Sequence, residues 1–196
     1  MNIRRLAGML ALGSLTILVG CGDEGVSSEE QARRAYLGLD TMVGKAMDLG
    51  FAGFNAATSA NISPQTASGT VKGTLTVTGQ VDQGSSANKG MRLKLALVDY
   101  QDDAQNNVVY ATDPAAPPAL ELSLKSIPTG TLTGALAGAF KMTGDLQGGT
   151  VLTLSMSGQL QADPADATKV QRKPGATHVT GTAQSPYGTY AVDITR

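Results

Sequence analysis

The sequence predicts a mainly β domain: a curved antiparallel sheet, or a partly open barrel, of about eight strands with one N-terminal amphipathic helix packed on its apolar face. Three observations carry this prediction. Apolar and polar residues alternate with a period of two through most of residues 69–195. Glycine and proline interrupt the alternation where turns are needed. A helical period occurs near the start, in residues 28–49.

The longest alternating stretch is residues 131–162, with apolar side chains at even positions and polar ones at odd positions on both sides of Gly148-Gly149. The residue numbers of two directly opposed residues must therefore sum to an even number. A register shifted by one residue would place the apolar side chains of one strand on the polar face of the sheet. A three-residue loop, residues 147–149, satisfies this rule. The sequence thus predicts a long hairpin with Phe140 opposite Met156.

The other strands follow from the same pattern. Residues 119–127 place leucines at even positions, and a three-residue turn before residue 131 would set Leu122 opposite Leu136. We expect the remaining strands at residues 69–81, 91–100, 108–112, 176–183 and 188–195. Residues 51–68 are expected to be a connection and residues 163–175 a loop.

Residues 28–49 have the spacing of an amphipathic helix. The apolar arc contains Ala32, Ala35, Leu39, Met42, Val43, Ala46 and Leu49. Ser27 and Glu30 have capping-box spacing at the start, and Gly50 suggests the end. The polar arc carries both signs of charge rather than the basic bias of membrane-surface helices, so we expect the apolar arc to pack on the sheet.

Composition excludes several functions. A net charge of −1 and the absence of Trp argue against nucleic acid, which requires a basic face. The lone cysteine permits no disulfide within the chain. His178, the only histidine, is expected to be an exposed strand residue, and no nucleophile elbow occurs. Asp99, Asp102, Asp103, Asn106 and Asn107 cluster as turn residues and match no calcium loop. No catalytic residue, metal or cofactor is predicted.

The first residues carry the strongest functional signal. Arg4-Arg5 precede a short apolar run, residues 6–17, and Leu18-Val19-Gly20-Cys21 closes the segment. The run is too short to span a bilayer comfortably and has the flanks of an export signal. The sequence therefore predicts that residues 1–20 direct secretion and are removed.

The closing sequence resembles the lipobox of bacterial lipoprotein precursors. That resemblance implies a diacylglycerol on the Cys21 sulfur, cleavage before Cys21, and an acyl chain such as palmitate on its new amino group. Residues 21–27 would then be the lipidated tether of a single domain, residues 28–196. Gly22 after the cysteine implies the outer membrane, with the domain facing the periplasm or the cell surface.

Two functions fit these expectations. The first is a non-enzymatic structural or protein-interaction module of the envelope, using its Thr/Ser/Gln-rich outer face or an exposed strand edge. The alternative is a carrier or sensor of a lipid-like apolar ligand held between helix and sheet. Its cavity would be lined by Leu136, Phe140, Met142, Leu154 and Met156. An enzyme is the third option. A helix that fills the concave face of the sheet would favour the first function. A helix that leaves a cavity between itself and the sheet would favour the carrier.

Overall fold

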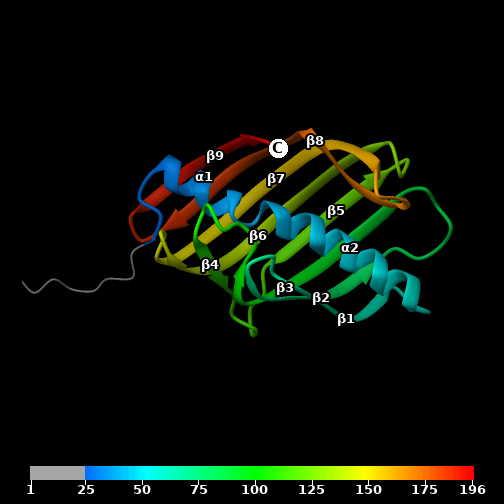
Figure 1. Ribbon diagram of the computed structural model, residues 1–196, viewed down its shortest axis with the longest axis horizontal. Helices are drawn as coiled ribbons and strands as arrows, with labels where there is room; N and C mark the ends of the chain where they lie inside the picture. Colours follow the sequence, from blue (N-terminus) through cyan, green and yellow to red (C-terminus); the bar gives the residue numbers. More distant parts are fainter. Residues whose placement is uncertain (1–24) are drawn as a thin grey trace, which may run out of the picture.

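The computed structural model describes residues 25–196, so the signal segment and Cys21 lie outside the described residues. The described chain begins with two helices and continues with nine strands (Figure 1). The helices are α1 (Glu29–Leu37) and α2 (Asp40–Ala56). The strands are β1 (Asn61–Ser68), β2 (Lys72–Val81), β3 (Lys89–Gln101), β4 (Val108–Ala111), β5 (Ala119–Lys125), β6 (Thr131–Gly144), β7 (Gly148–Asp163), β8 (Asp166–Ser185) and β9 (Gly188–Thr195).

All nine strands form one antiparallel sheet in the order β1-β2-β3-β4-β6-β7-β8-β9. β5 pairs with β3 and β6, so β4 and β5 share the space between these two longer strands. β1 and β9 lie at the two edges. The mainly β fold with an antiparallel sheet is thereby confirmed. The structure has one strand more than the eight predicted. This strand is β1, which lies within residues 51–68, where a connection was expected.

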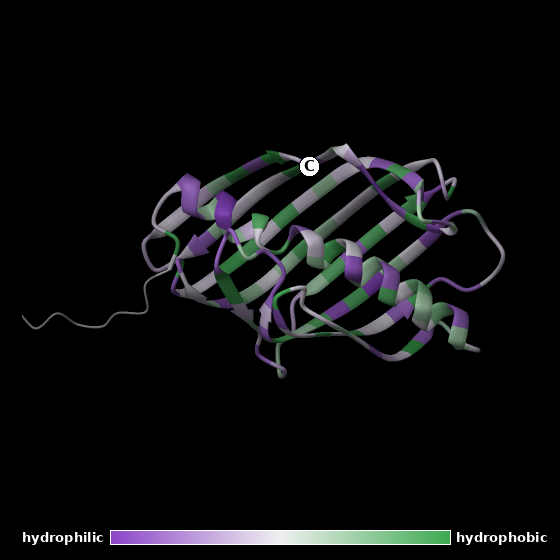
Figure 2. Ribbon diagram, in the orientation of Figure 1, coloured by the Kyte–Doolittle hydropathy of each residue, from purple (hydrophilic) through white to green (hydrophobic). Residues whose placement is uncertain are grey.

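The helices lie across one face of the sheet, and the core lies between the two layers (Figure 1). Hydropathy alternates along the long strands, which is what a sheet with one buried face requires (Figure 2). The helices bury Tyr36, Met42, Val43, Ala46 and Met47, and the strands meet them with Leu93, Leu120, Leu136, Leu154 and Val179. The predicted packing of the N-terminal helix on the apolar face is confirmed.

The helical segment differs from the prediction at three points. It starts one residue later, because Ser28 is the N-cap and its hydroxyl accepts from the Gln31 backbone N–H at 3.2 Å. It is interrupted at Gly38, where an added Cβ would lie 2.3 Å from the Tyr110 hydroxyl. It also continues past Gly50 to Ala56. Gly50 is buried against β3 and permits close packing there, so this glycine does not end the helix.

Two helical glycines give a prediction with an internal control. A Cβ at Gly44 would meet nothing within 4 Å, whereas one at Gly53 would lie 2.8 Å from the Ile62 Cβ on β1. We expect Gly44→Ala to raise the free energy of unfolding by up to about 1 kcal/mol, because alanine favours a helix over glycine. Gly53→Ala should lower it despite the same propensity gain. Urea unfolding of both variants measures the difference, and a stabilising Gly53→Ala would contradict the close packing of α2 on β1.

The hairpin of β6 and β7 has the expected face but not the expected register. Paired residues have even sums, as predicted, yet Phe140 lies opposite Thr150 rather than Met156. The last pair is Met142 with Gly148, so the loop is longer than three residues. The end of β6 leaves β7 here and pairs with β4, where Gly144 faces Val108. Side-chain alternation determines the face of a strand but not its position along the partner.

The turn between β5 and β6 is also longer than expected. Lys125 pairs with Thr131, which leaves five residues in the loop, and Leu122 lies opposite Gly134 instead of Leu136. Ser126 opens this loop with a φ of 54°, in the left-handed region that few side chains favour. The leucines nonetheless keep the buried face. Across residues 25–196, no helix has the length and apolar character needed to cross a bilayer.

Candidate functional site: two chambers beside α2

The first half of β8 folds over α2, because β8 contains a large bulge. Gly158 on β7 pairs with Thr177, but Leu160, two residues on, pairs with Arg172. The extra residues, which include Pro174 and Gly175, bend β8 towards the helix layer. In Figure 1 this orange segment crosses in front of the sheet above α2. The predicted loop 163–175 is therefore mostly strand, and it forms one wall of two open chambers.

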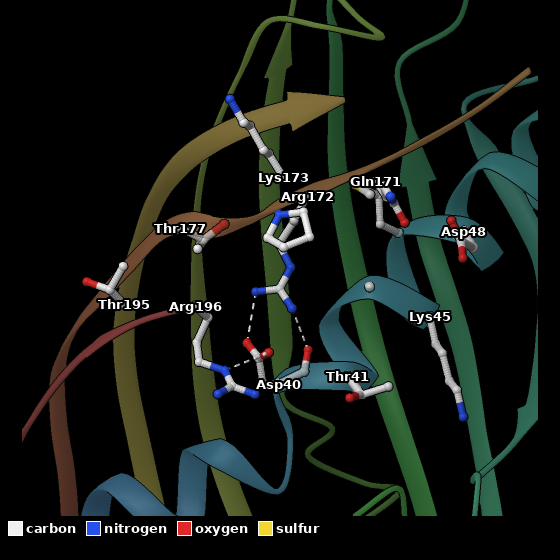
Figure 3. Close-up of a pocket in the computed structure, with 14 residues that line it drawn as sticks. Asp40, Thr41, Lys45, Asp48, Gln171, Arg172, Lys173, Thr177, Thr195 and Arg196 are labelled. Carbon is white, nitrogen blue, oxygen red and sulfur yellow. Dashed lines mark hydrogen bonds and ion pairs between the residues drawn. The ribbon is translucent and has the colours of Figure 1, made fainter. Parts of the chain in front are cut away.

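An ion-pair cluster joins this wall to the start of α2 (Figure 3). Asp40 is 8% exposed, and its Oδ1 accepts from Arg172 Nη1 at 2.8 Å and from the Tyr36 hydroxyl at 2.7 Å. Arg172 Nη2 also donates to the Asp40 backbone carbonyl at 2.7 Å, and Arg196 Nε lies 3.3 Å from Asp40 Oδ2. A carboxylate beside the first turn of a helix is favoured by the helix dipole. The cluster thus connects α1, α2, β8 and the end of β9.

The electrostatics of the cluster keep its ion pair charged. Burial alone would raise the pKa of the Asp40 carboxyl, but hydrogen bonding to Arg172, the Arg172 charge and the Tyr36 hydroxyl together hold it below its usual value. Burial would lower the pKa of Arg172, and Asp40 overcomes this and raises it. Burial, with the Asp40 charge, raises the pKa of the Tyr36 hydroxyl. Because these groups satisfy one another's charges and hydrogen bonds, the cluster acts as a structural clasp between the helices and β8.

The first chamber lies beside this clasp and has a volume of about 630 Å³. Its lysines bind other parts of the protein. Lys45 Nζ lies 2.6 Å from Asp102 Oδ1, and Lys173 Nζ lies 3.5 Å from Gln159. Figure 3 shows Lys173 extending away from the clasp. Within the described chain, the buried hydroxyl of Thr177 has no hydrogen-bond partner. This chamber is a polar notch whose charges are largely paired.

The second chamber lies at the C-terminal end of α2 and has a volume of about 500 Å³. Asp48 lines both chambers, which are therefore neighbours along one side of the helix. The second chamber is mainly apolar, and its wall includes Phe51, Ala52, Phe54, Ile127, Pro128 and Val170. Its volume falls within the usual range for small-molecule sites. An apolar cavity with a few polar groups at its wall is the arrangement of a ligand pocket.

Lys89 is the unusual residue of the second chamber. It is 5% exposed, and its Nζ lies 4.3 Å from the centroid of the Phe54 ring. The ammonium also donates to the Gly84 carbonyl. Within residues 25–196, the salt bridges are made by other side chains, and no acidic group lies within 4 Å of this ammonium. A nearly buried cation with no ion-pair partner within 4 Å is costly, and an anion in the chamber would offset that cost.

The five residues predicted to bind an apolar ligand lie elsewhere. Leu136, Phe140, Met142, Leu154 and Met156 are at most 3% exposed and lie on the inner face of β6 and β7. Leu136 and Leu154 are direct cross-strand partners. None of these five residues contributes to the wall of either chamber beside α2. Phe140 alone lines a separate surface pocket, together with Gln184 and Pro186. The helices cover this part of the concave face.

Sequence reasoning missed the second chamber for identifiable reasons. Its walls come from the end of α2 and from the start of β8, two stretches that were expected to be irregular. Phe51 and Phe54 do continue the helical spacing beyond Gly50, and this signal could have extended the helix. Lys89 gives no such signal, because its burial depends on the loop at Gly84 and on a distant helix.

The other polar candidates occupy structural positions. His178 is exposed on the outer face, where its Nε2 lies 2.7 Å from Asp193 Oδ1 across β8 and β9. Asp102 accepts from Lys45, Thr70 and the Tyr100 hydroxyl, and so fixes α2 to the β1–β2 turn and to β3. Among the described residues, no group of three or more His, Cys, Asp or Glu side chains is placed to hold a metal. Of the turn residues 99–107, Asp102 and Asn106 bind the helices, whereas Asp103 bonds within its own turn.

Comparison with models of protein families, with curated proteins and with solved structures finds no match to this chain.

Proposed function

We propose that the protein is an exported lipoprotein, anchored in the outer membrane through lipid on Cys21, whose domain is a non-enzymatic protein-interaction module of the cell envelope. The export signal and the Leu18-Val19-Gly20-Cys21 ending support the anchor. A lipidated cysteine carries more than one acyl chain, and two chains make anchoring stable where one is marginal. The domain itself supports the interaction role by the position at which the chain enters it.

The described chain enters at one end of the long strands. A Cβ on Gly25 would lie 2.6 Å from the Ser185 Cβ and 2.7 Å from the Gly149 carbonyl oxygen, and Ser185 Oγ donates to the Val26 carbonyl at 2.5 Å. Three residues lie between Cys21 and Gly25. The four residue steps reach about 14 Å when fully extended. An anchor on Cys21 would therefore keep the β6–β7 and β8–β9 turns close to the bilayer.

The second chamber lies at the opposite end. It is lined by Ile127 and Pro128, just before β6 begins, whereas Gly149 lies next to the last β6–β7 pair. From Thr131 to Met142 the strand extends about 35 Å, given the rise per residue of a strand. The second chamber thus lies at the end of the domain opposite to the one that the anchor would hold. This separation is the observation that carries the proposal, since a surface far from the bilayer is free to meet a partner.

The lipid anchor on Cys21 gives a prediction of its own. Cells producing the full chain in the presence of an alkyne analogue of palmitate should label it, and the protein should sediment with outer membranes. Cys21→Ala should abolish both the label and the membrane association, because it removes the acceptor sulfur. Gly22→Ala serves as a matched control and should keep the label. An unlabelled wild-type chain would refute lipidation.

Two surfaces suit a protein partner. β9 is an edge strand whose eight residues all pair regularly with β8, and no strand among residues 25–196 pairs with its other side, which can therefore accept an added strand. The other edge, β1, contains Pro64 and a register shift, which discourage such pairing. The outer face of β6 and β7 presents small uncharged side chains, including Thr133, Thr153 and Ser155. The β9 edge is the better candidate for an ordered interface.

Site-specific photo-crosslinking tests these surfaces in the living envelope. A photoreactive amino acid at Thr195, at the end of β9 away from the anchored turn, should capture a discrete partner, whereas the same amino acid at Gln65 on β1 should not. Ser155 on the outer face provides the third position. Equal yields of the same product from all three positions would indicate random collision and would argue against an interaction module.

A carrier of a lipid-like ligand is the second candidate function. The observation that favours it is the apolar second chamber, rather than the concave face that the sequence suggested. The two functions make different demands on the domain. An interaction module requires only an accessible surface, whereas a carrier requires a ligand that enters the chamber and leaves it again.

A further inference from the structure

We infer that the second chamber binds an acyl chain with a carboxylate headgroup, as in a long-chain fatty acid, and that Lys89 pairs with the carboxylate. This inference concerns the folded domain and does not depend on the anchor at Cys21. It rests on the apolar walls of the chamber, on the buried ammonium at its side and on the absence of an ion-pair partner for that ammonium among residues 25–196.

The walls suit a hydrocarbon chain. Phe51 and Phe54 lie on α2, Ile127 and Pro128 in the turn before β6, and Val170 on β8, so three separate elements surround the same space. Phe51, Phe54 and Ile127 pack against the core while each stays partly exposed. An acyl chain would cover this exposed apolar surface and gain about 0.8 kcal/mol for each methylene buried.

The headgroup requirement follows from Lys89. An ammonium group has three N–H donors. The Lys89 ammonium makes one hydrogen bond, to the Gly84 carbonyl, and one contact with the Phe54 ring. Asp82, the acid in the same loop, interacts with the Lys89 charge, which helps to lower the pKa of its carboxyl, but it lies beyond ion-pair distance and already accepts from Arg92 at 2.9 Å and from the Gly90 N–H at 3.0 Å. A ligand carboxylate would supply the missing negative charge in a partly desolvated position, where such a pair is strong.

The other charged side chains of the second chamber determine its net charge. Lys169 lies at its exposed wall and forms a long contact, 3.7 Å, with Asp166, so it remains available to attract an anion. Asp48 opposes an anion, and desolvation by the surrounding walls raises the pKa of its carboxyl. The two lysines exceed the single acid in this lining, so the chamber favours a carboxylate over a neutral headgroup.

Native mass spectrometry of the chain from Gly22 to Arg196 tests the inference, because the buried hydrophobic residues of the described chain lie between Val26 and Ile194. The probes are dodecanoate and dodecanol, which share a chain and differ in charge, and butyrate, which has the charge without the chain. We expect one bound dodecanoate, about 10- to 100-fold weaker binding of dodecanol, and no butyrate complex.

Lys89→Met keeps the apolar stem beside Phe54 and removes the charge. It should bring dodecanoate down to the affinity of dodecanol while leaving dodecanol unchanged. Asp48→Asn should have the opposite effect and strengthen dodecanoate alone. If Lys89→Met fails to fold, as judged by circular dichroism, Lys169→Met provides the same comparison at the chamber's other lysine, with a smaller expected loss.

Ala52→Trp tests the place of binding. Ala52 is exposed on the chamber wall, so a tryptophan there should fill the space without disturbing the core and should abolish binding of both probes. Ala137→Trp, on the outer face of β6, is the matched control and should bind like the wild type. Equal affinity for dodecanoate and dodecanol, or binding that survives Ala52→Trp, would overturn the inference.

Discussion

Replacing Asp40 with Asn is expected to lower the free energy of unfolding by about 3–5 kcal/mol, because it leaves a largely buried guanidinium without its counter-charge. Asp40 and Arg172 have side chains that are 11% and 14% exposed, and two hydrogen bonds join these residues. Asparagine preserves the shape of the side chain but not the charge. Chemical denaturation monitored by circular dichroism measures the loss.

Three other variants separate the charge from its surroundings. Tyr36→Phe removes one hydrogen bond to Asp40 and should cost about 1 kcal/mol. Replacing both members of the pair, with Asp40→Asn and Arg172→Met together, should cost less than Asp40→Asn alone, because the only charge left without its partner is then the half-exposed guanidinium of Arg196. Glu30→Gln, at an exposed pair 3.8 Å from Arg33, should change little. An equal loss for Glu30→Gln and Asp40→Asn would contradict the role assigned to the clasp.

The pH dependence of the unfolding free energy also tests the role of Asp40, because the direction of the change is predicted. The folded-state pKa of Asp40 lies below its unfolded value of about 3.9, so its contribution to stability is present above that pH and is lost as the pH falls through the folded pKa. The stability difference between the wild type and Asp40→Asn should therefore be constant from about pH 5 to 8 and shrink below about pH 4. A difference that grows in acid would contradict the lowered pKa.

The sequence was most informative where alternation is uninterrupted. From Leu132 to Leu160 it predicted which side chains of β6 and β7 face the core, because one buried face permits no slip by a single residue. It did not predict the register. Beyond Met142 the end of β6 pairs with β4 and not with β7, with Gly144 opposite Val108, and this long-range contact leaves no mark in the local pattern.

The candidate site was less accessible to sequence reasoning, for a physical reason. The clasp joins Asp40 to Arg172, 132 positions apart, and the charge pattern of either segment alone resembles a solvated surface. Lys173 and Pro174 break the alternation of β8, which suggested a loop where the strand has a bulge. Gly50 suggested a helix end because its close approach to β3 is invisible without the sheet. Buried charges and bulges are set by tertiary contacts.

Phe140→Ala is expected to lower the free energy of unfolding by about 3–5 kcal/mol while leaving the binding of dodecanoate unchanged. Phe140 is 1% exposed and belongs to the continuous core beneath the helices, so truncating its ring leaves a cavity that the neighbours fill only in part. Phe140→Leu retains most of the volume and should cost much less. Unfolding in urea gives the stability, and native mass spectrometry of the folded fraction gives the binding.

The combination of these two readouts distinguishes a core position from a ligand contact. A side chain that lines an open cavity has solvent or ligand on one side, so its truncation costs little stability and reduces affinity. A core side chain shows the reverse. For Phe140 the reverse is expected, and for Lys89 a loss of carboxylate preference at nearly constant stability. A stable Phe140→Ala protein with weakened binding would move the ligand from the second chamber to the concave face of β6 and β7.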